Sequence, residues 1–218
     1  MKHPFSLEHL FSFLESQSIV LSDHQKDQFG VYQDLLKTWS GKQNLVSRSD
    51  VFHLAERHFL PSALLSFSLP ESVNGKLIDI GTGAGFPGIV LKILKPELSL
   101  SLLDSSHKKV LFLEEVCDQL DLDCPVMCRR VEEYIPAEAD KYLIAISRAV
   151  ARLDLLWKLS GHLLSSGGCL FAFKGGDYQH EIDDLDQKNL KIKVIVPARE
   201  WLEVSNYLMH KYIIKLET

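Results

Sequence analysis

Lys76-Leu-Ile-Asp-Ile-Gly-Thr-Gly-Ala-Gly-Phe-Pro-Gly88 is the stretch that decides the fold of this chain. It begins with a short β-prone apolar run, 77–80, which is typical of a buried parallel strand. Four glycines follow, and apolar residues at helical spacing resume at 89–94. Glycines at such a turn allow positive φ angles and let a ligand approach the backbone closely. The order of strand, turn and helix predicts the first half of a βαβ unit with a ligand site at the turn.

Acidic residues around the turn indicate the kind of ligand. Gly83, Gly85 and Gly88 fit the G-x-G-x-x-G dinucleotide pattern, which alone is a weak signal. Asp79 would repel a pyrophosphate but suits an ammonium or sulfonium group, as in S-adenosylmethionine. Asp104 ends the next apolar strand about twenty residues on, where a carboxylate can accept both ribose hydroxyls. That second acid serves NAD equally well, and a tight corner without a ligand is the remaining alternative.

From residue 77 onward the hydrophobic pattern alternates between strands and helices. The expected strands are 77–80, 100–104, 125–128, 142–146, 169–173, 191–196 and about 207–216, and the expected helices are about 87–95, 107–120, 153–165 and 178–188. A short loop joins the last two strands, so we expect them to pair antiparallel. The predicted fold class is α/β, a Rossmann-like class I S-adenosylmethionine-dependent methyltransferase with a mostly parallel seven-stranded sheet and an antiparallel C-terminal edge. A dehydrogenase of two mononucleotide halves fits this layout less well.

The first part of the chain has a different pattern. Residues 1–65 are predicted to form an N-terminal helical extension packed on the main domain, 66–218. Ser22 begins a capping-box pattern before a helix with an apolar face. A third helix from about residue 49 carries Arg57 and His58 on its polar side, as either a solvated face or part of a site.

Composition limits the classes of function. The chain has 218 residues and a net charge of −5, which excludes a generally basic nucleic-acid binder and leaves a local patch as the only RNA contact. It has no apolar run of membrane length and no signal-peptide pattern, so a cytoplasmic location without membrane contact is expected. The four cysteines lack C-x-x-C spacing, and no metal is expected. We expect a monomer.

Cations gather where the predicted strands end, which is the ligand edge of an open α/β sheet. Lys108 and Lys109 lie in the first turn of a predicted helix, where the helix dipole disfavours positive charge. That unfavourable position favours a function for them. A basic rim on an acidic protein predicts a polyanionic substrate. The candidate RNA-binding residues are Arg57, His58, Lys108, Lys109, Arg152 and Lys174.

The chain resembles the RsmG (GidB) family of bacterial small-subunit ribosomal RNA guanine-N7 methyltransferases over nearly its whole length. The specific motifs are the Gly85-Phe-Pro-Gly88 ending of the turn and Ser147-Arg148-Ala149 after the fourth strand. Further matches are Tyr32…Leu35-Leu36…Trp39…Asn44-Leu45, Arg57-His58, Leu103-Asp104-Ser105, Lys108-Lys109, Arg130-Val-Glu-Glu133 and Lys174-Gly175. The chain departs from the family pattern at Ser40 and Pro61.

The resemblance implies which residues hold S-adenosylmethionine and what is methylated. It implies cofactor binding by Gly81 and Phe86 in the turn, by Val131 and Glu132 near the adenine, and by Arg148, and Asp104 matches the acid expected at the ribose. With Asp79, Gly83 and Gly85 of the glycine turn, these are the expected cofactor-binding residues. The implied target is ring nitrogen 7 of a guanine in small-subunit (16S) ribosomal RNA, either free or within a ribosomal particle. Arg148 is the expected catalytic residue, as a contact to the cofactor or to the guanine carbonyl, with Asp79 or Asp104 as its charge partner.

Nitrogen 7 carries a free lone pair, so its methylation needs no general base, only proximity and orientation. The absence of an obvious acid–base constellation agrees with this chemistry. Two other functions stay open at this level. They are a small-molecule methyltransferase of the same fold and a non-catalytic ribosome assembly factor.

Overall fold

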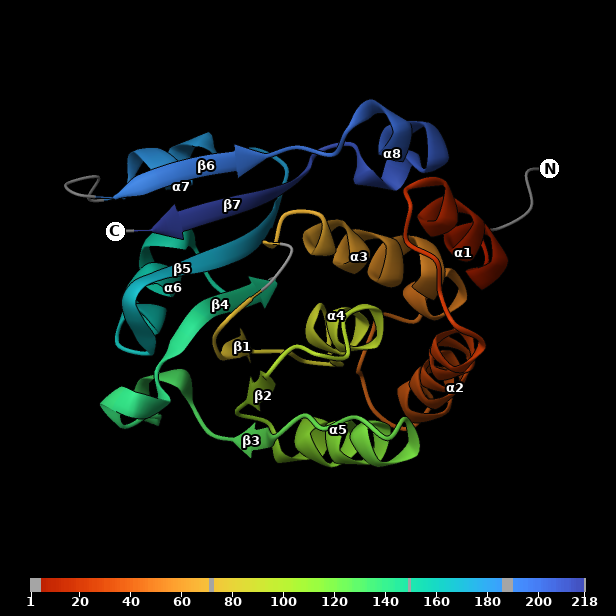
Figure 1. Cartoon of the computed structure of the whole chain (residues 1–218), viewed down its shortest axis with the longest axis horizontal. Coiled ribbons are helices and arrows are strands. Elements are labelled where there is room, and N and C mark those ends of the chain that lie inside the picture. The colour runs from red at the N-terminus through yellow and green to blue at the C-terminus, as the bar shows by residue number, and fades with distance from the viewer. Residues whose placement is uncertain (1–4, 71–72, 149, 186–189, 218) are drawn as a thin grey trace.

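The computed structural model describes residues 5–70, 73–148, 150–185 and 190–217. Its centre is a seven-stranded sheet in the order β3-β2-β1-β4-β5-β7-β6 (Figure 1). The strands are β1 Leu77–Ile80, β2 Leu100–Asp104, β3 Val126–Cys128, β4 Tyr142–Arg148, β5 Leu164–Gly175, β6 Lys191–Ile195 and β7 Lys211–Glu217. Neighbours from β3 to β5 pair parallel, and β7 pairs antiparallel with both β5 and β6. The predicted fold class is confirmed.

Helices cover both faces of the sheet in two layers (Figure 1). The first layer contains α1 Leu7–Ser16, α2 Asp23–Ser40, α3 Leu60–Ser66, α4 Gly88–Leu94, α5 His107–Gln119 and α8 Arg199–Val204. The second contains α6 Leu153–Gly161 and α7 Gln179–Asp183. Side chains alternate across each strand, so in β1 Leu77 faces the first layer whereas Ile78 and Ile80 face the second. The central strands are therefore buried on both faces.

The connection between β6 and β7 is longer than the predicted short loop. It contains α8 and the 3₁₀ turn Asn206–Leu208, neither of which was expected. Trp201 anchors α8, because its buried ring makes edge contacts with Phe13 and Phe67. The predicted antiparallel pairing is correct, although β7 starts later than expected. The helix expected at 178–188 ends at residue 183, and 186–188 lie outside the described residues.

The N-terminal helices pack into the same core as α4 and α5. Ser22 caps α2 with both hydrogen bonds of a capping box, as predicted. Phe29, Tyr32 and Leu36 are fully buried on its inner face. The third helix begins as a 3₁₀ turn, Asp50–His53, continues as a π-helical segment, Ala55–Phe59, and becomes α3. The expected domain boundary at residue 65 therefore falls at the last turn of α3.

Candidate active site at the carboxyl ends of the strands

The glycine turn after β1 holds three glycines in the left-handed region. Gly81 and Gly83 have φ angles of 63° and Gly85 has 94°. A Cβ on Gly85 would lie 2.7 Å from the Tyr32 hydroxyl, so packing within the protein requires that glycine. A Cβ on Gly83 would meet only the carbonyl of Gly81, at 3.8 Å. Gly83 therefore borders open space, where a ligand can approach the backbone.

Asp79 is buried below this turn and holds it in shape. Its Oδ2 accepts hydrogen bonds from Thr82 Oγ1 at 2.7 Å and from the Gly88 amide at 2.8 Å. Its Oδ1 is buried and has no hydrogen-bond partner among the described residues. Burial raises the pKa of Asp79 to about 7, although the two hydrogen bonds act in the opposite direction. The free oxygen is an acceptor for a donor that the described residues do not supply.

Asp104 ends β2 and ties three segments together. Its Oδ2 accepts from the Gly83 amide at 2.9 Å, and its Oδ1 accepts from the Ser106 amide at 2.9 Å. The ammonium of Lys109 lies 3.4 Å from Oδ2. The carboxylate therefore links the turn to the start of α5, and Lys109 lies against it.

An aromatic cluster supports the turn from the N-terminal helices. The Tyr32 hydroxyl donates to the Ala84 carbonyl at 2.6 Å, which fixes the middle of the turn. The buried Phe86 ring stacks on His58 with 4.8 Å between centroids and lies 5.5 Å from Tyr32. The sequence identified Phe86, but not that Tyr32 and His58 would form its surroundings.

Arg148, at the end of β4, points into this cluster. Its guanidinium lies 5.6 Å from the Phe86 ring centre, and Nη2 donates to the Arg57 carbonyl at 3.1 Å. Nη1 is buried and has no hydrogen-bond partner in the part of the chain that the structure describes. The expected ion pair with Asp79 or Asp104 is wrong, because no carboxylate of the described chain lies within 4.0 Å of Arg148. Backbone and imidazole acceptors take that place. Ala149, next in the motif, lies outside the described residues.

His58 is buried, so its interpretation as part of a solvated face is wrong. Burial and the Arg148 charge lower the pKa of His58 to about 3, so the imidazole is neutral at physiological pH. Nδ1 lies 3.0 Å from Arg148 Nη2 and must accept, because a guanidinium only donates. Nε2 then carries the hydrogen and faces Asp50 Oδ2 at 3.7 Å. Asp50 also accepts from Arg57 at 2.6 Å, so one carboxylate orients both residues of the pair.

The π-helical turn explains this burial. A π-helical segment accommodates one extra residue in a turn and occurs often at functional sites. Within Ala55–Phe59 it turns His58 toward Phe86 and leaves Arg57 half-exposed. An ordinary helical projection of the sequence places both side chains on the polar face.

A cavity of about 220 Å³ opens beside Arg148. Its lining is basic and aromatic and contains neither a carboxylate nor a histidine: Arg57, Pro61, Arg148, Phe173, Lys174, Gly175, Tyr207 and Lys211. The sequence did not identify Tyr207 and Lys211. The Tyr207 ring centre lies 4.8 Å from the Lys211 ammonium and 5.8 Å from the Arg57 guanidinium. Lys211 could have been found, because the first residue of an antiparallel strand lies at the edge where parallel strands end.

The other predicted RNA-binding cations differ in exposure and in whether they already form ion pairs. Lys174 donates to Glu181 Oε2 and to the Ala151 carbonyl, both at 2.6 Å, and is largely buried. Arg152 is ion-paired with Asp184 and Asp154. Lys108 is exposed and has no ion pair within the described residues. Of the residues expected near the adenine, Val131 is buried in a 3₁₀ turn and Glu132 is exposed, 4.0 Å from Arg130.

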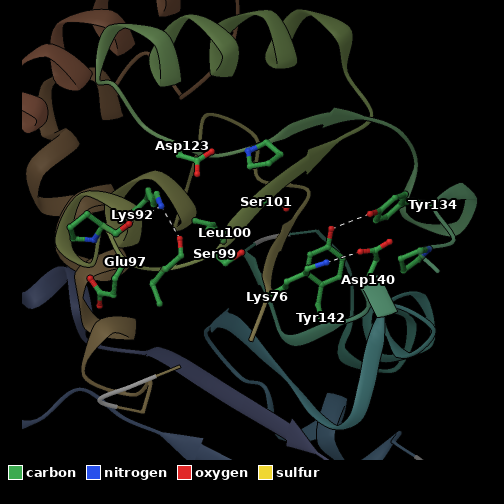
Figure 2. Close-up of a pocket in the computed structure, with 14 residues that line it drawn as sticks. Lys76, Lys92, Glu97, Ser99, Leu100, Ser101, Asp123, Tyr134, Asp140 and Tyr142 are labelled. Atoms are coloured by element: carbon green, nitrogen blue, oxygen red, sulfur yellow. Dashed lines mark hydrogen bonds and ion pairs between the residues drawn. The ribbon is translucent and has the colours of Figure 1, made fainter. Parts of the chain in front are cut away.

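A larger cavity, about 660 Å³, lies at the opposite edge of the sheet (Figure 2). It adjoins the first residues of β2 and β4 and contains a Lys76–Asp140 ion pair and a hydrogen bond between the hydroxyls of Tyr134 and Tyr142. The cavity therefore lies at the amino ends of the strands. The glycine turn lies at their carboxyl ends, where open α/β sheets bind their ligands, so the cavity is remote from it. Within the described residues no cluster of three or more His, Cys, Asp or Glu side chains could hold a metal ion. Among the described helices, none combines the length and apolar character that crossing a bilayer requires.

The residues at the turn fit S-adenosylmethionine. The open space beside Gly83 admits a ligand to the backbone, and the free Oδ1 of Asp79 can accept from an ammonium group. Asp104 ends the neighbouring strand β2, and both of its oxygens accept hydrogen bonds from backbone amides. Of the four buried side-chain atoms without a hydrogen-bond partner in the described chain, Asp79 Oδ1, Arg148 Nη1 and His58 Nε2 belong to this site, and the fourth is Ser40 Oγ on α2.

Solved structures share this fold at low sequence identity. The plantazolicin methyltransferase BpumL in complex with SAH superposes with a TM-score of 0.56 at 13% identity, covering 90% of this chain and 99% of that one. A mutant of MtNAS in complex with S-adenosylmethionine gives a TM-score of 0.57 at 12% identity, covering 97% and 77%. At these identities the likeness shows the class I methyltransferase fold alone.

Sequence relatives narrow the assignment. The "Ribosomal RNA small subunit methyltransferase G" of Acetivibrio thermocellus is 42% identical over 158 residues, which are 71% of this chain and 65% of that protein. The protein of the same name from Mesoplasma florum is 41% identical over 186 residues, 84% of this chain and 78% of that one. The model of the GidB family, rRNA small subunit methyltransferase G, matches residues 25–203. The chain therefore belongs to the GidB family of small-subunit ribosomal RNA methyltransferases, which are S-adenosylmethionine-dependent enzymes.

Proposed function

We propose that this chain transfers the methyl group of S-adenosylmethionine to ring nitrogen 7 of a guanine in 16S ribosomal RNA, with the base bound in the cavity beside Arg148. The observation that carries the proposal is the lining of that cavity, which offers cations and aromatic rings but neither a carboxylate nor a histidine. Methylation of an amino group or a hydroxyl must remove a proton, whereas nitrogen 7 has none to lose. The enzyme is proposed to act as a monomer in the cytoplasm.

The bound cofactor supplies a methyl group on a positively charged sulfur. The chain supplies position: the Asp79 carboxylate would accept from the ammonium of the ligand, and the open space at Gly83 would let the ligand approach the backbone. Arg148 Nη1 donates to the guanine carbonyl, oxygen 6, which is next to the reacting nitrogen and leaves its lone pair free. The neutral His58 holds the other end of that guanidinium. Orientation of this kind supplies several kcal/mol of the barrier reduction.

Methyl transfer from radiolabelled S-adenosylmethionine to 16S RNA and small-subunit particles from a strain lacking the gene tests the proposal. Mass spectrometry of the labelled nucleoside should find 7-methylguanosine at one site. Label on another atom would overturn the assignment to nitrogen 7. Cofactor binding without transfer to either RNA substrate would instead favour a small-molecule methyltransferase or an assembly factor.

Gly83→Asp is expected to abolish cofactor binding and to leave the fold intact. The new side chain would fill the open space beside the turn and add a second negative charge next to Asp104. Gly167→Asp is the matched control, because Gly167 has a φ of 74°, also borders open space and lies away from the glycine turn. Thermal unfolding should show a similar loss of stability in both variants, because both strain a backbone with positive φ. Calorimetry with S-adenosylmethionine should show lost binding in Gly83→Asp only. Normal binding by Gly83→Asp would move the site elsewhere.

Lys108→Ala is expected to weaken RNA binding without changing cofactor affinity, because its ammonium is exposed and unpaired in the described chain. The slope of log K against log salt should fall by about 0.7–0.9 if one phosphate contact is lost. Lys109→Ala should also change cofactor affinity, because Lys109 lies against Asp104. Lys158→Ala, an exposed lysine on α6 in the other helix layer, is the control. An unchanged slope for Lys108→Ala would remove this lysine from the RNA interface.

A further inference from the structure

A second basic surface lies on the N-terminal helices, outside the active site. It is a hollow of about 590 Å³ after the end of α2. Its lining includes Lys37, Lys42, Gln43, Asn44, Arg48 and Phe52, and no carboxylate. The whole segment 35–49 lacks Asp and Glu, in a chain whose net charge is −5. Local positive charge of this kind attracts a polyanion.

The cations of this hollow are available to a ligand. Lys42 and Arg48 are exposed, and neither forms an ion pair or side-chain hydrogen bond within the described residues. The ammonium of Lys37 already donates hydrogen bonds to Asp34 at 3.2 Å and to Gln33 at 2.9 Å. Two unpaired cations and two side-chain amides are the groups that contact phosphates and base edges.

Phe52 is the unusual feature, because a large apolar side chain is 80% exposed there. It belongs to the 3₁₀ turn Asp50–His53 and borders a second hollow of about 470 Å³ on its other side. Both hollows share Lys37, Val51 and Phe52, so the ring stands between them. An exposed aromatic ring next to free cations is the arrangement on which unpaired bases stack.

This surface is linked to the active site through Asp50. Asp50, two residues before Phe52, holds Arg57 and faces His58. Phe52 lies six positions before His58 in one uninterrupted helical segment, 50–66, so one short RNA segment can reach both side chains. On its other side, Trp39 at the end of α2 contacts Phe112 of α5, the helix whose first turn contains Lys108.

We propose that the hollow between Lys42, Arg48 and Phe52 binds a single-stranded nucleotide of the substrate RNA a few positions from the target guanine, with its base stacked on Phe52. This inference rests on the proposed function, because the bound segment is part of the same RNA. The cations neutralise its phosphates, and the ring holds its base whatever its identity. The N-terminal helices thereby set which guanine reaches Arg148.

The test compares Phe52→Ala and Phe52→Trp with the unchanged enzyme, using protein-free 16S RNA at low salt and small-subunit particles. Phe52→Ala should weaken RNA binding about tenfold and Phe52→Trp should restore it, since loss of one stacked base has an effect of this size. The KM for RNA should rise in Phe52→Ala, while kcat at saturating RNA and cofactor affinity stay unchanged. Lys42→Ala with Arg48→Ala should reduce the salt slope by about 1.4 for two contacts to a single strand.

Ile135→Ala is the matched control, because Ile135 is also 80% exposed but lies beside the cavity at the opposite edge of the sheet. Unchanged RNA affinity in Phe52→Ala, with normal methylation by the unchanged enzyme, would overturn the stacking proposal and leave the proposed function standing. Weaker binding to particles but not to protein-free RNA would assign Phe52 to a ribosomal protein, which also overturns it. If the unchanged enzyme binds only particles, unchanged particle affinity in Phe52→Ala would overturn the proposal. Failure of the unchanged enzyme to methylate any guanine would reject the proposed function itself.

Discussion

Asp79→Asn is expected to give a more stable protein that binds S-adenosylmethionine at least tenfold more weakly. Asparagine can keep an oxygen where Thr82 and Gly88 donate, but it removes a buried charge. The pKa of Asp79 rises from 3.8 to about 7, and each unit corresponds to about 1.4 kcal/mol. We expect a gain on the order of 2 kcal/mol in the free energy of unfolding at pH 8. Affinity falls because the neutral amide attracts an ammonium group less.

The gain in stability from Asp79→Asn should depend on pH. Because the folded-state pKa is raised, the unfolded chain ionises this group first as pH rises from about 4 to 7. The group therefore lowers the stability of the unchanged protein across that window, and the advantage of Asp79→Asn should grow from pH 5 to pH 8. Cofactor affinity of the unchanged protein should fall as pH drops below 7, since the protonated carboxyl no longer pairs with an ammonium.

Urea unfolding at both pH values and calorimetry in buffers of different ionisation enthalpy measure these effects. Binding at pH 7 should release protons from the unchanged protein and none from Asp79→Asn. Asp118→Asn, an exposed carboxylate on α5, should change neither quantity. A variant that is less stable at pH 8 than the unchanged protein would show that the negative charge is not a cost to the fold.

Arg148→Ala is expected to lower kcat/KM for methyl transfer at least a hundredfold. The side chain is the only one of the cavity lining with a buried donor, Nη1, that lacks a partner in the described chain, and loss of one aligned donor has effects of this size. Arg148→Lys should restore little, because a lysine cannot hold His58 and reach the base together. Arg199→Ala, on the exposed side of α8, is the control.

A second readout separates this role from a general loss of structure. Burial and Arg148 together hold the pKa of His58 near 3, while Asp50 acts in the opposite direction. Removing the guanidinium should raise the pKa of His58, which proton NMR can follow. An unchanged His58 pKa would contradict the contact between the two side chains. Normal methyl transfer by Arg148→Ala would remove Arg148 from the catalytic machinery.

The sheet and the glycine turn could be predicted because their signals are local. Strand 77–80 and the glycines after it are adjacent in sequence, and the structure gives β1 the same bounds. The surroundings of Arg148 could not be predicted, since its partners lie about ninety residues away. Lys211 reaches the same edge only because β7 inserts antiparallel between β5 and β6.

The burial of His58 was missed for a different reason. Its direction depends on a π-helical segment, which has no recognisable pattern in a single sequence. The polar periodicity around Arg57 predicted an ordinary α-helix, whereas one turn of that helix is π-helical in the structure. Residue types at the site were therefore predictable, but the angle at which the third helix presents them was not.

The shared core of the N-terminal helices has a consequence for synthesis on the ribosome. Their apolar faces, including Phe29 and Tyr32, emerge well before the turn at Ala84 and the strand that ends in Arg148. These helices cannot complete their packing until that later sequence has been translated. A nascent chain stopped near residue 70 would therefore expose the apolar faces of these helices, which chaperones can bind. The cavity beside Arg148 also requires Tyr207 and Lys211, so its lining is complete only after these residues have been translated.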